Sequence, residues 1–302
     1  APATSLLALT ALQCTPSDDG GPVGPELPDF DRSAMLENLA DNVILPGYQS
    51  ALVESGELEV AITGYCDALG TGDEANELEA ARAAFENAMH AWQMAELMSI
   101  GPAHPLKEAM RDNVYSWPVV SGCAVDQDVA LASEGDYDIT ARLVNRRGLD
   151  ALEYLLFNEE EASACPPQST PEGWNEMALA DKQQIRCDYA LLAVADLQNQ
   201  QSAIIDAWNA EYRADFVAAG QDGSSYALDQ DAINEVYEAI FYLELKTKDH
   251  KLGGAAGKTE NECSAVNAPC LDMLESPFAL KSKEYILGNL DGFEQLFNGG
   301  EG

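Results

Sequence analysis

The sequence predicts an all-α protein built from helical bundles. Apolar residues recur at steps of three and four along nearly every long segment, whereas the alternating pattern of β-strands is almost absent. Loops rich in glycine, serine and proline separate the periodic segments. A helix with one apolar face buries that face against other helices, so we expect bundle packing.

Two long helices are expected in the first third of the chain. Residues 33–69 are periodic throughout, and Pro46 is expected to kink this helix while Gly56 lies near a break. Residues 73–102 open with acidic residues, which favour a helix N-terminus, and Gly101-Pro102 should end the segment.

The second of these helices places a carboxylate on its apolar stripe. Phe85, Met89 and Trp92 define the stripe, and Glu96 follows Trp92 by one turn on the same line. Glu96 should therefore point into the core. One explanation is a salt bridge to Arg142, Arg146 or another basic side chain, and the other is a role in binding.

The remaining periodic segments complete the bundle. The sequence predicts short helices within 103–145, a helix over 146–157, one extended helix or two in line over 174–216, and helices over 229–251 and 276–297, with long loops at 217–228 and 253–269.

The stretch RRGLDALEYLLF, residues 146–157, holds two carboxylates one turn apart. Glu153 lies on the margin of a leucine stripe, so it should be partly dry, and Asp150 follows Arg146 at the spacing of an ion pair. In one interpretation Arg146 and Arg147 neutralise these acids. A carboxylate in an apolar groove is costly unless it is paired or holds a cation, so a binding site is the other interpretation.

The charge of the chain restricts its partners. With 52 acidic and 16 basic residues the formal net charge is -36, which argues against direct binding of nucleic acid or of an anionic membrane surface. Cations would be attracted instead. The composition favours an acidic surface that serves only solubility over a charge tuned for a ligand, and the two can hold together.

The N-terminal residues indicate export. APATSLLALTALQC is a short apolar run ending at Cys14, too short to span a bilayer but typical of the apolar region of a secretory signal, and the Pro-, Gly- and Asp-rich stretch after it cannot form a core. This arrangement is typical of a bacterial lipoprotein, with Cys14 as the lipidated residue and residues 1–32 as signal remnant and tether. Gln13 is not the small residue expected before such a cysteine, and a cleaved signal is the alternative.

The other six cysteines suit an oxidising compartment. They are Cys66, Cys123, Cys165, Cys187, Cys263 and Cys270. An even number without any C-x-x-C favours three disulfides over a zinc or thioredoxin-type site. Sequence proximity suggests Cys263–Cys270 and Cys165–Cys187, which leaves Cys66–Cys123.

Several stretches resemble the imelysin family, also called the M75 peptidase or iron-regulated protein A-like family. They are LENLADNVILPGYQSAL, AWQMAELMSIGP, RRGLDALEYLLF and KDHKLGG, in that order. Gly148 and Glu153 match the first and last positions of the family signature G-x-H-x-x-E, and Asp150 stands where the histidine should be. The resemblance implies two bundle-like halves, 33–145 and 146–302, with a site in the cleft between them.

A binding role linked to iron or other metal acquisition is the function that the resemblance and the acids favour together. Hard cations such as ferric iron or calcium prefer oxygen ligands, and Asp150, Glu153 and Glu96 are the candidate metal ligands. Arg146 and Trp92 complete the candidate ligand-binding residues. We expect an exported protein of the periplasm or outer membrane, in contact with the membrane only through a lipid anchor, and with envelope proteins of metal uptake as partners.

Two other functions stay open. A metallopeptidase of the M75 type would need zinc ligands, yet His90, His104 and His250 lie in no zinc-protease motif, and no serine nucleophile motif occurs. No catalytic residue is therefore assigned. A helical adaptor that docks a partner protein in the envelope is the other alternative.

Overall fold

The computed structural model describes residues 30–103, 109–259, 263 and 268–300. Arg32–Gly302 form one compact unit. All regular elements in these described ranges are helical, which confirms the all-α class. Cys14 and His104 lie outside the described residues.

The first long helix contains a π-helical turn. Helix α1 (Arg32–Leu39) continues through a π-helical segment η1 (Ala40–Ile44) into α2 (Leu45–Ala68). Pro46 lies at the start of α2, and because proline has no N–H to donate, the irregular turn falls directly before it. The break expected near Gly56 is wrong, since Gly56 lies inside α2.

Helix α3 (Glu74–Ala95) returns beside α2 and ends earlier than its sequence pattern suggests. Glu96 caps its C-terminus, and Gly101 adopts φ +62° at the start of a short 3-10 turn, η2 (Gly101–Ala103). The helix therefore ends close to Glu96, so this side chain projects from the last turn rather than from mid-helix.

Shorter elements fill the middle of the chain. They are α4 (Ala109–Val114), α5 (Gly122–Ser133), the 3-10 turns η4 (Ile139–Ala141) and η5 (Val144–Arg146), α6 (Gly148–Phe157) and η6 (Trp174–Glu176).

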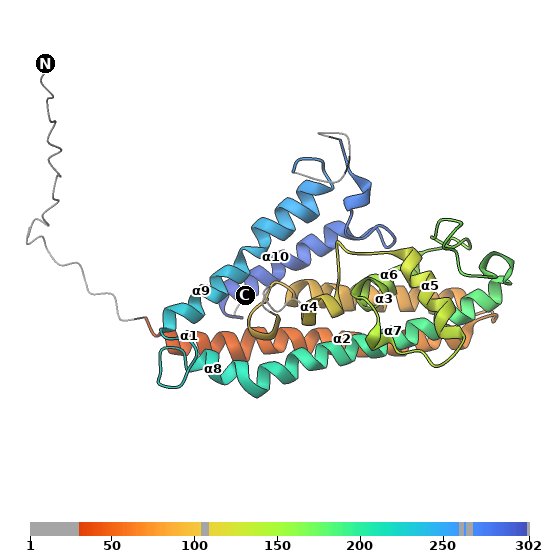
Figure 1. Cartoon of the computed structure of the whole chain (residues 1–302). Coiled ribbons are helices and arrows are strands. Elements are labelled where there is room, and N and C mark those ends of the chain that lie inside the picture. Colours follow the sequence, from red (N-terminus) through yellow and green to blue (C-terminus); the bar gives the residue numbers. More distant parts are fainter. Residues whose placement is uncertain (1–29, 104–108, 260–262, 264–267, 301–302) are drawn as a thin grey trace, which may run out of the picture. The chain divides into compact units, whose positions relative to one another are not determined.

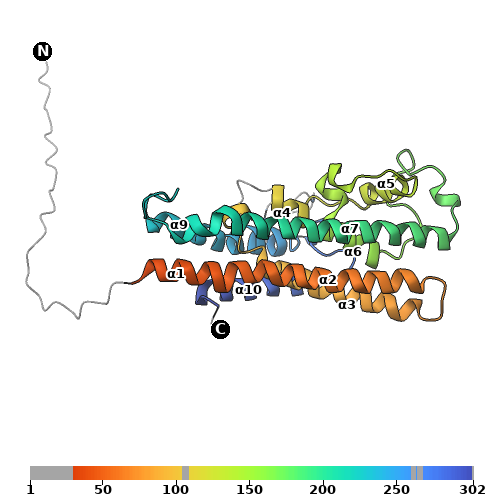
Figure 2. The same ribbon diagram turned by 90° about the horizontal axis from the view of Figure 1, so that it is seen from below.

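The second half is led by α7, as the long periodic segment predicted. The elements are α7 (Leu179–Ala207), η7 (Trp208–Tyr212), α8 (Arg213–Val217), α9 (Asp229–Ile240), the π-helical η8 (Leu243–Gly254), η9 (Leu271–Met273) and α10 (Ser282–Asn298). Figure 2 shows α1 and α2 in line, with α7 running alongside them.

Helices from both halves of the sequence share one core. Helix α2 packs on α3 and on α7, α6 packs against α7 and α3, and α10 lies against α3 (Figure 1). Phe85, Trp92 and Trp208 are fully buried in this core. The expected division of the chain into two bundles at residue 145 stays a prediction. The site is positioned by α6 and α10, which both pack against α3.

Three disulfides are present, and two of the expected pairings are wrong. Cys263–Cys270 is confirmed, but the other bridges are Cys66–Cys187 and Cys123–Cys165. Because α2 and α7 pack side by side, Cys66 meets a partner 121 residues away, which sequence proximity could not indicate.

Candidate functional site

Helix α6 begins at a glycine that no other residue could replace without strain. Gly148 has φ +72°, and an added Cβ would lie 2.6 Å from the carbonyl oxygen of Val114. The first turn of α6 therefore lies directly against the end of α4. This contact brings Asp150 next to Ser116.

Asp150 is a buried carboxylate held by one serine. Its Oδ2 atom accepts the backbone N–H of Ser116 at 2.6 Å and the Ser116 hydroxyl at 3.0 Å, and only 9% of the residue is exposed. Burial raises the pKa of Asp150 to about 7, against the lowering effect of Ser116 and with further increases from Glu153 and Glu275. Asp150 is therefore poised to gain or lose a proton near neutral pH.

Glu153, one turn later, is held through a single oxygen. Its Oε1 atom accepts the Ser276 hydroxyl at 2.9 Å and the backbone N–H groups of Phe278 and Ala279 at 3.1 and 2.9 Å. Burial raises the pKa of Glu153 to about 7 even though these donors oppose the rise. The expectation that Glu153 is shielded from water is confirmed, since it is 3% exposed.

The two arginines before α6 do not neutralise these acids. Arg146 donates to Asp128 at 2.7 Å, and Arg147 lies 3.0 Å from Asp196. The available Arg146–Asp150 pair is therefore not formed, because the extended backbone at Arg147 turns both arginines toward α5 and α7. Arg146 lies outside the immediate surroundings of Asp150.

Glu96 points inward, as its place on the apolar stripe predicted, and two cations hold it. It is 1% exposed and pairs with Lys251, with Arg111 at 3.3 Å and with the amide of Asn289 at 3.0 Å. Burial alone would raise the pKa of Glu96, but Lys251 and Arg111 outweigh it and lower the pKa. The salt-bridge explanation is thus correct, with partners other than Arg142 and Arg146.

Glu275 joins the same buried network. Its Oε1 atom lies 2.7 Å from Lys251 Nζ and accepts from Tyr115 and Gln93 at 3.0 Å each. Its Oε2 atom is buried and has no hydrogen-bond partner among the described residues. Burial and the charge of Glu96 raise the pKa of Glu275 despite Lys251.

Four acids therefore share one buried region, yet they do not form a metal cage. Among the described residues no group of three acidic, histidine or cysteine side chains could hold a metal ion. Glu96 is committed to Lys251 and Arg111, while Asp150 and Glu153 each keep one oxygen free of hydrogen bonds from the described residues. Metal binding by Asp150, Glu153 and Glu96 stays a prediction.

A pocket of about 290 Å³ opens onto Asp150. Its walls are mostly apolar and come from α5, α6 and residues 271–278, with Val120, Tyr154 and Phe278 among them. Asp272 also lines it. Trp92, a candidate ligand-binding residue, is fully buried in the core and lines no part of this pocket.

The sequence interpretation missed the basic and hydroxyl residues of the site. Lys251, in the KDHKLGG stretch, has a fully buried side chain. The resemblance of this stretch to the family does not by itself single out the lysine. Ser116, Ser276 and Glu275 carry no pattern that distinguishes them in the sequence.

The described histidines lie away from these acids. His90 is about half exposed, with Nε2 3.9 Å from Asp291 Oδ2, and His250 is exposed. Neither contributes to the buried network.

A family model described as Peptidase_M75: Imelysin matches residues 44–302. The chain belongs to the imelysin family. Position 150 of this imelysin is an aspartate in the first turn of α6, where the signature G-x-H-x-x-E has a histidine.

Relatives of known sequence or structure agree with this assignment. Iron-regulated protein A of Synechococcus elongatus is 25% identical over 224 residues, which are 72% of this chain and 54% of that protein. The chain thus spans about half the length of the curated relative that it matches.

Two solved structures share the fold. An imelysin-like protein from Psychrobacter arcticum has a TM-score of 0.60 at 17% identity, covering 87% of this chain and 73% of that one. A protein from Parabacteroides distasonis, described as a proposed iron-regulated protein A precursor, has a TM-score of 0.63 at 17% identity, covering 89% and 74%. A search of the described helices for a segment long and apolar enough to cross a membrane finds none.

Proposed function

We propose that this imelysin is an exported, lipid-anchored binding component of iron or other metal acquisition in the cell envelope. Its ligand enters the pocket above Asp150. The relatives named for iron regulation support the link to iron. The three disulfides support an oxidising compartment outside the cytoplasm.

The observation that carries the proposal is a buried carboxylate without a cation. Asp150 has no ion-pair partner among the described residues, and its Oδ1 atom receives no hydrogen bond from them, although a pocket reaches it. A charged carboxylate in such surroundings gains most from a bound cation. The buried cations Lys251 and Arg147 are already paired, Lys251 with Glu96 and Glu275 and Arg147 with Asp196.

The residues present fit a metal cargo only as part of a larger ligand set. Hard cations take six or more oxygen ligands. Asp150 offers one free carboxylate oxygen to the pocket, and Glu153, one turn later, does not line it. The pocket has room for water molecules or an organic chelator to supply the others. Asp150 is thus the protein ligand on which the proposal depends most.

Thermal melting with ferric, calcium and zinc ions tests the proposal. A ligand that binds only the native state raises the free energy of unfolding, by about 2.7 kcal/mol at a hundredfold excess over Kd, and so raises the melting temperature. Asp150→Asn should abolish the rise, and Glu153→Gln should reduce it. Glu57→Gln, which removes an exposed acid of α2, is the control for unspecific cation binding to an acidic surface.

Two results would contradict the proposal. One is a melting temperature that no ion changes in the wild type. The other is a rise that Asp150→Asn and Glu57→Gln leave equally intact.

A further inference from the structure

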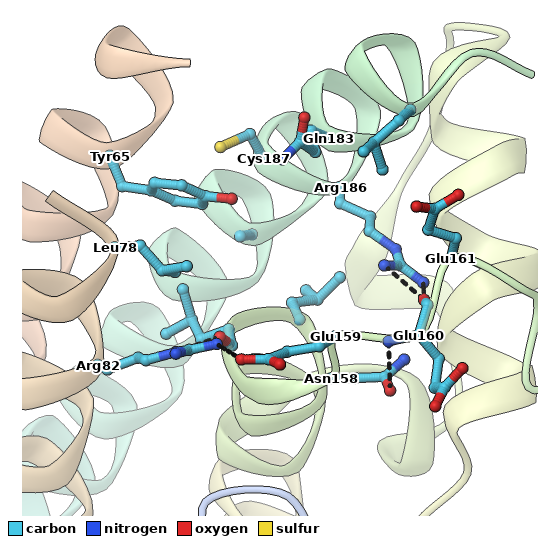
Figure 3. A pocket seen from close by; sticks show the side chains of 14 residues that line it. Tyr65, Leu78, Arg82, Asn158, Glu159, Glu160, Glu161, Gln183, Arg186 and Cys187 are labelled. Atoms are coloured by element: carbon cyan, nitrogen blue, oxygen red, sulfur yellow. Dashed lines mark hydrogen bonds and ion pairs between the residues drawn. The ribbon is translucent and has the colours of Figure 1, made fainter. Parts of the chain in front are cut away.

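A second pocket, of about 260 Å³, shares no lining residue with the pocket above Asp150. It lies among α2, α3, the end of α6 and the first half of α7 (Figure 3). Leucine side chains at 78, 155, 156 and 179 and the disulfide at Cys187 give it apolar walls. This volume lies near the lower limit of small-molecule sites.

Arg186 brings a guanidinium to this pocket, and it shares its charge with one buried carboxylate. Both of its terminal nitrogens donate to one neutral acceptor, the carbonyl oxygen of Glu160, at 3.3 Å. One terminal nitrogen also forms an ion pair of 3.6 Å with the buried carboxylate of Asp126, which accepts its hydrogen bonds from Tyr154 at 2.9 Å and Ala164 at 2.7 Å. This ion pair is too long to be a hydrogen bond, so it takes up no N–H of Arg186. The Arg186 side chain is only 14% exposed, so water screens its charge poorly.

The arginine is also held rigidly. Its guanidinium carbon lies 5.5 Å from the ring centroid of Trp174 and 5.9 Å from that of Tyr154. Each terminal nitrogen of a guanidinium carries two hydrogens, and the Glu160 carbonyl uses one of each. Arg186 is therefore a preorganised donor that can accept a further anion.

The opposite wall offers a second donor. The hydroxyl of Tyr65 makes no hydrogen bond with the described residues, and Figure 3 shows it pointing into the pocket. Arg82 lies below it and pairs with Glu159 at 3.2 Å, but Glu159 is 81% exposed, so this pair contributes little energy.

We infer that this pocket binds a small organic anion with an apolar body and one carboxylate. The body packs on the leucines, and the carboxylate accepts from Arg186 and from the hydroxyl of Tyr65. The site is independent of the proposed metal function, because it uses different residues.

The acidic rim of this pocket limits its affinity for an anion. Glu160 and Glu161 are exposed and oppose an approaching anion, as does the net charge of -36. Figure 3 shows the carboxylate of Glu160 directed away from Arg186. Glu160→Gln should therefore tighten binding of the anion a few-fold without altering the donors.

Three probes with one apolar body test the inference: 4-phenylbutyrate, 4-phenylbutylamine and 4-phenylbutanol, measured by isothermal calorimetry on the full chain. The carboxylate should bind tightest. Tyr65→Phe and Arg186→Lys should each weaken its binding about tenfold while leaving that of the alcohol unchanged, since each removes a hydrogen bond to a charged group.

Matched controls separate binding from folding. Arg213→Lys alters an arginine that pairs with Asp41 at 2.6 Å, away from this pocket, and should leave all affinities unchanged. Tyr65→Phe removes one hydroxyl that has no hydrogen-bond partner among the described residues, so it tests the site even if Arg186→Lys unfolds the chain. The inference is overturned if the amine binds tightest or if the three probes bind equally or not at all. It is also overturned if Tyr65→Phe leaves the affinity for 4-phenylbutyrate unchanged.

Discussion

Replacing Asp150 with asparagine should remove a specific part of the pH dependence of folding stability. The side-chain oxygen of asparagine can still accept both hydrogen bonds from Ser116, so the geometry of the first turn of α6 is retained. What the change removes is the ability to ionise in a buried position.

The sign follows from the two pKa values. In the unfolded chain Asp150 ionises near pH 4, whereas in the folded chain burial raises its pKa from 3.8 to about 7. The stability that the neutral acid contributes is complete below pH 4 and is lost as the pH rises through about 7.

The magnitude follows from the difference of about three between the folded and unfolded pKa values of Asp150. Each unit corresponds to about 1.4 kcal/mol, so the wild type should lose about 4 kcal/mol relative to Asp150→Asn between pH 4 and pH 8. Repulsion among the many surface carboxylates changes both proteins alike and cancels in the difference.

Urea unfolding of both proteins at pH 4, 5, 6, 7 and 8, with disulfides intact, measures this difference. Asp272→Asn, at an exposed carboxylate that lines the same pocket, is the control and should stay within about 0.5 kcal/mol of the wild type throughout. A difference between wild type and Asp150→Asn that varies by less than about 1 kcal/mol across this range would refute burial as the cause of the raised pKa.

Two further substitutions test the supports of the site by urea unfolding. Lys251→Met should cost about 3–5 kcal/mol, because it leaves two buried carboxylates without their shared cation, whereas Lys248→Met, at a surface pair, should cost about 1 kcal/mol or less. Equal costs for the two lysines would show that the buried pairing is not essential. Gly148→Ala should lower the free energy of unfolding by about 1–3 kcal/mol or more, because of the positive φ at this position and a clash with the α4 backbone. Gly72→Ala, with open space around it, should be close to neutral.

Helical periodicity was enough to predict the fold class and the orientation of three acids. Glu96, Asp150 and Glu153 were singled out because they interrupt or border apolar stripes, and all three are buried. This succeeds because a helix fixes which side chains share a face, independently of the rest of the chain.

Partners of those acids could not be predicted, because they come from remote segments. Lys251 lies 155 residues after Glu96, and Ser276 lies 123 residues after Glu153. Arg146 was one turn from Asp150, yet Asp128 on α5 holds it instead. Spacing along a helix gives the opportunity for an ion pair, and the arrangement of helices decides which one forms.

The connectivity of the bridges has a consequence for how the chain matures. Cys66–Cys187 encloses Cys123–Cys165, so the two crosslinks are nested. A polypeptide that emerges N-terminus first exposes Cys66 and Cys123 to oxidant well before Cys187. A premature link between those two thiols would hold α2 to α5 and would have to be exchanged before α7 could dock.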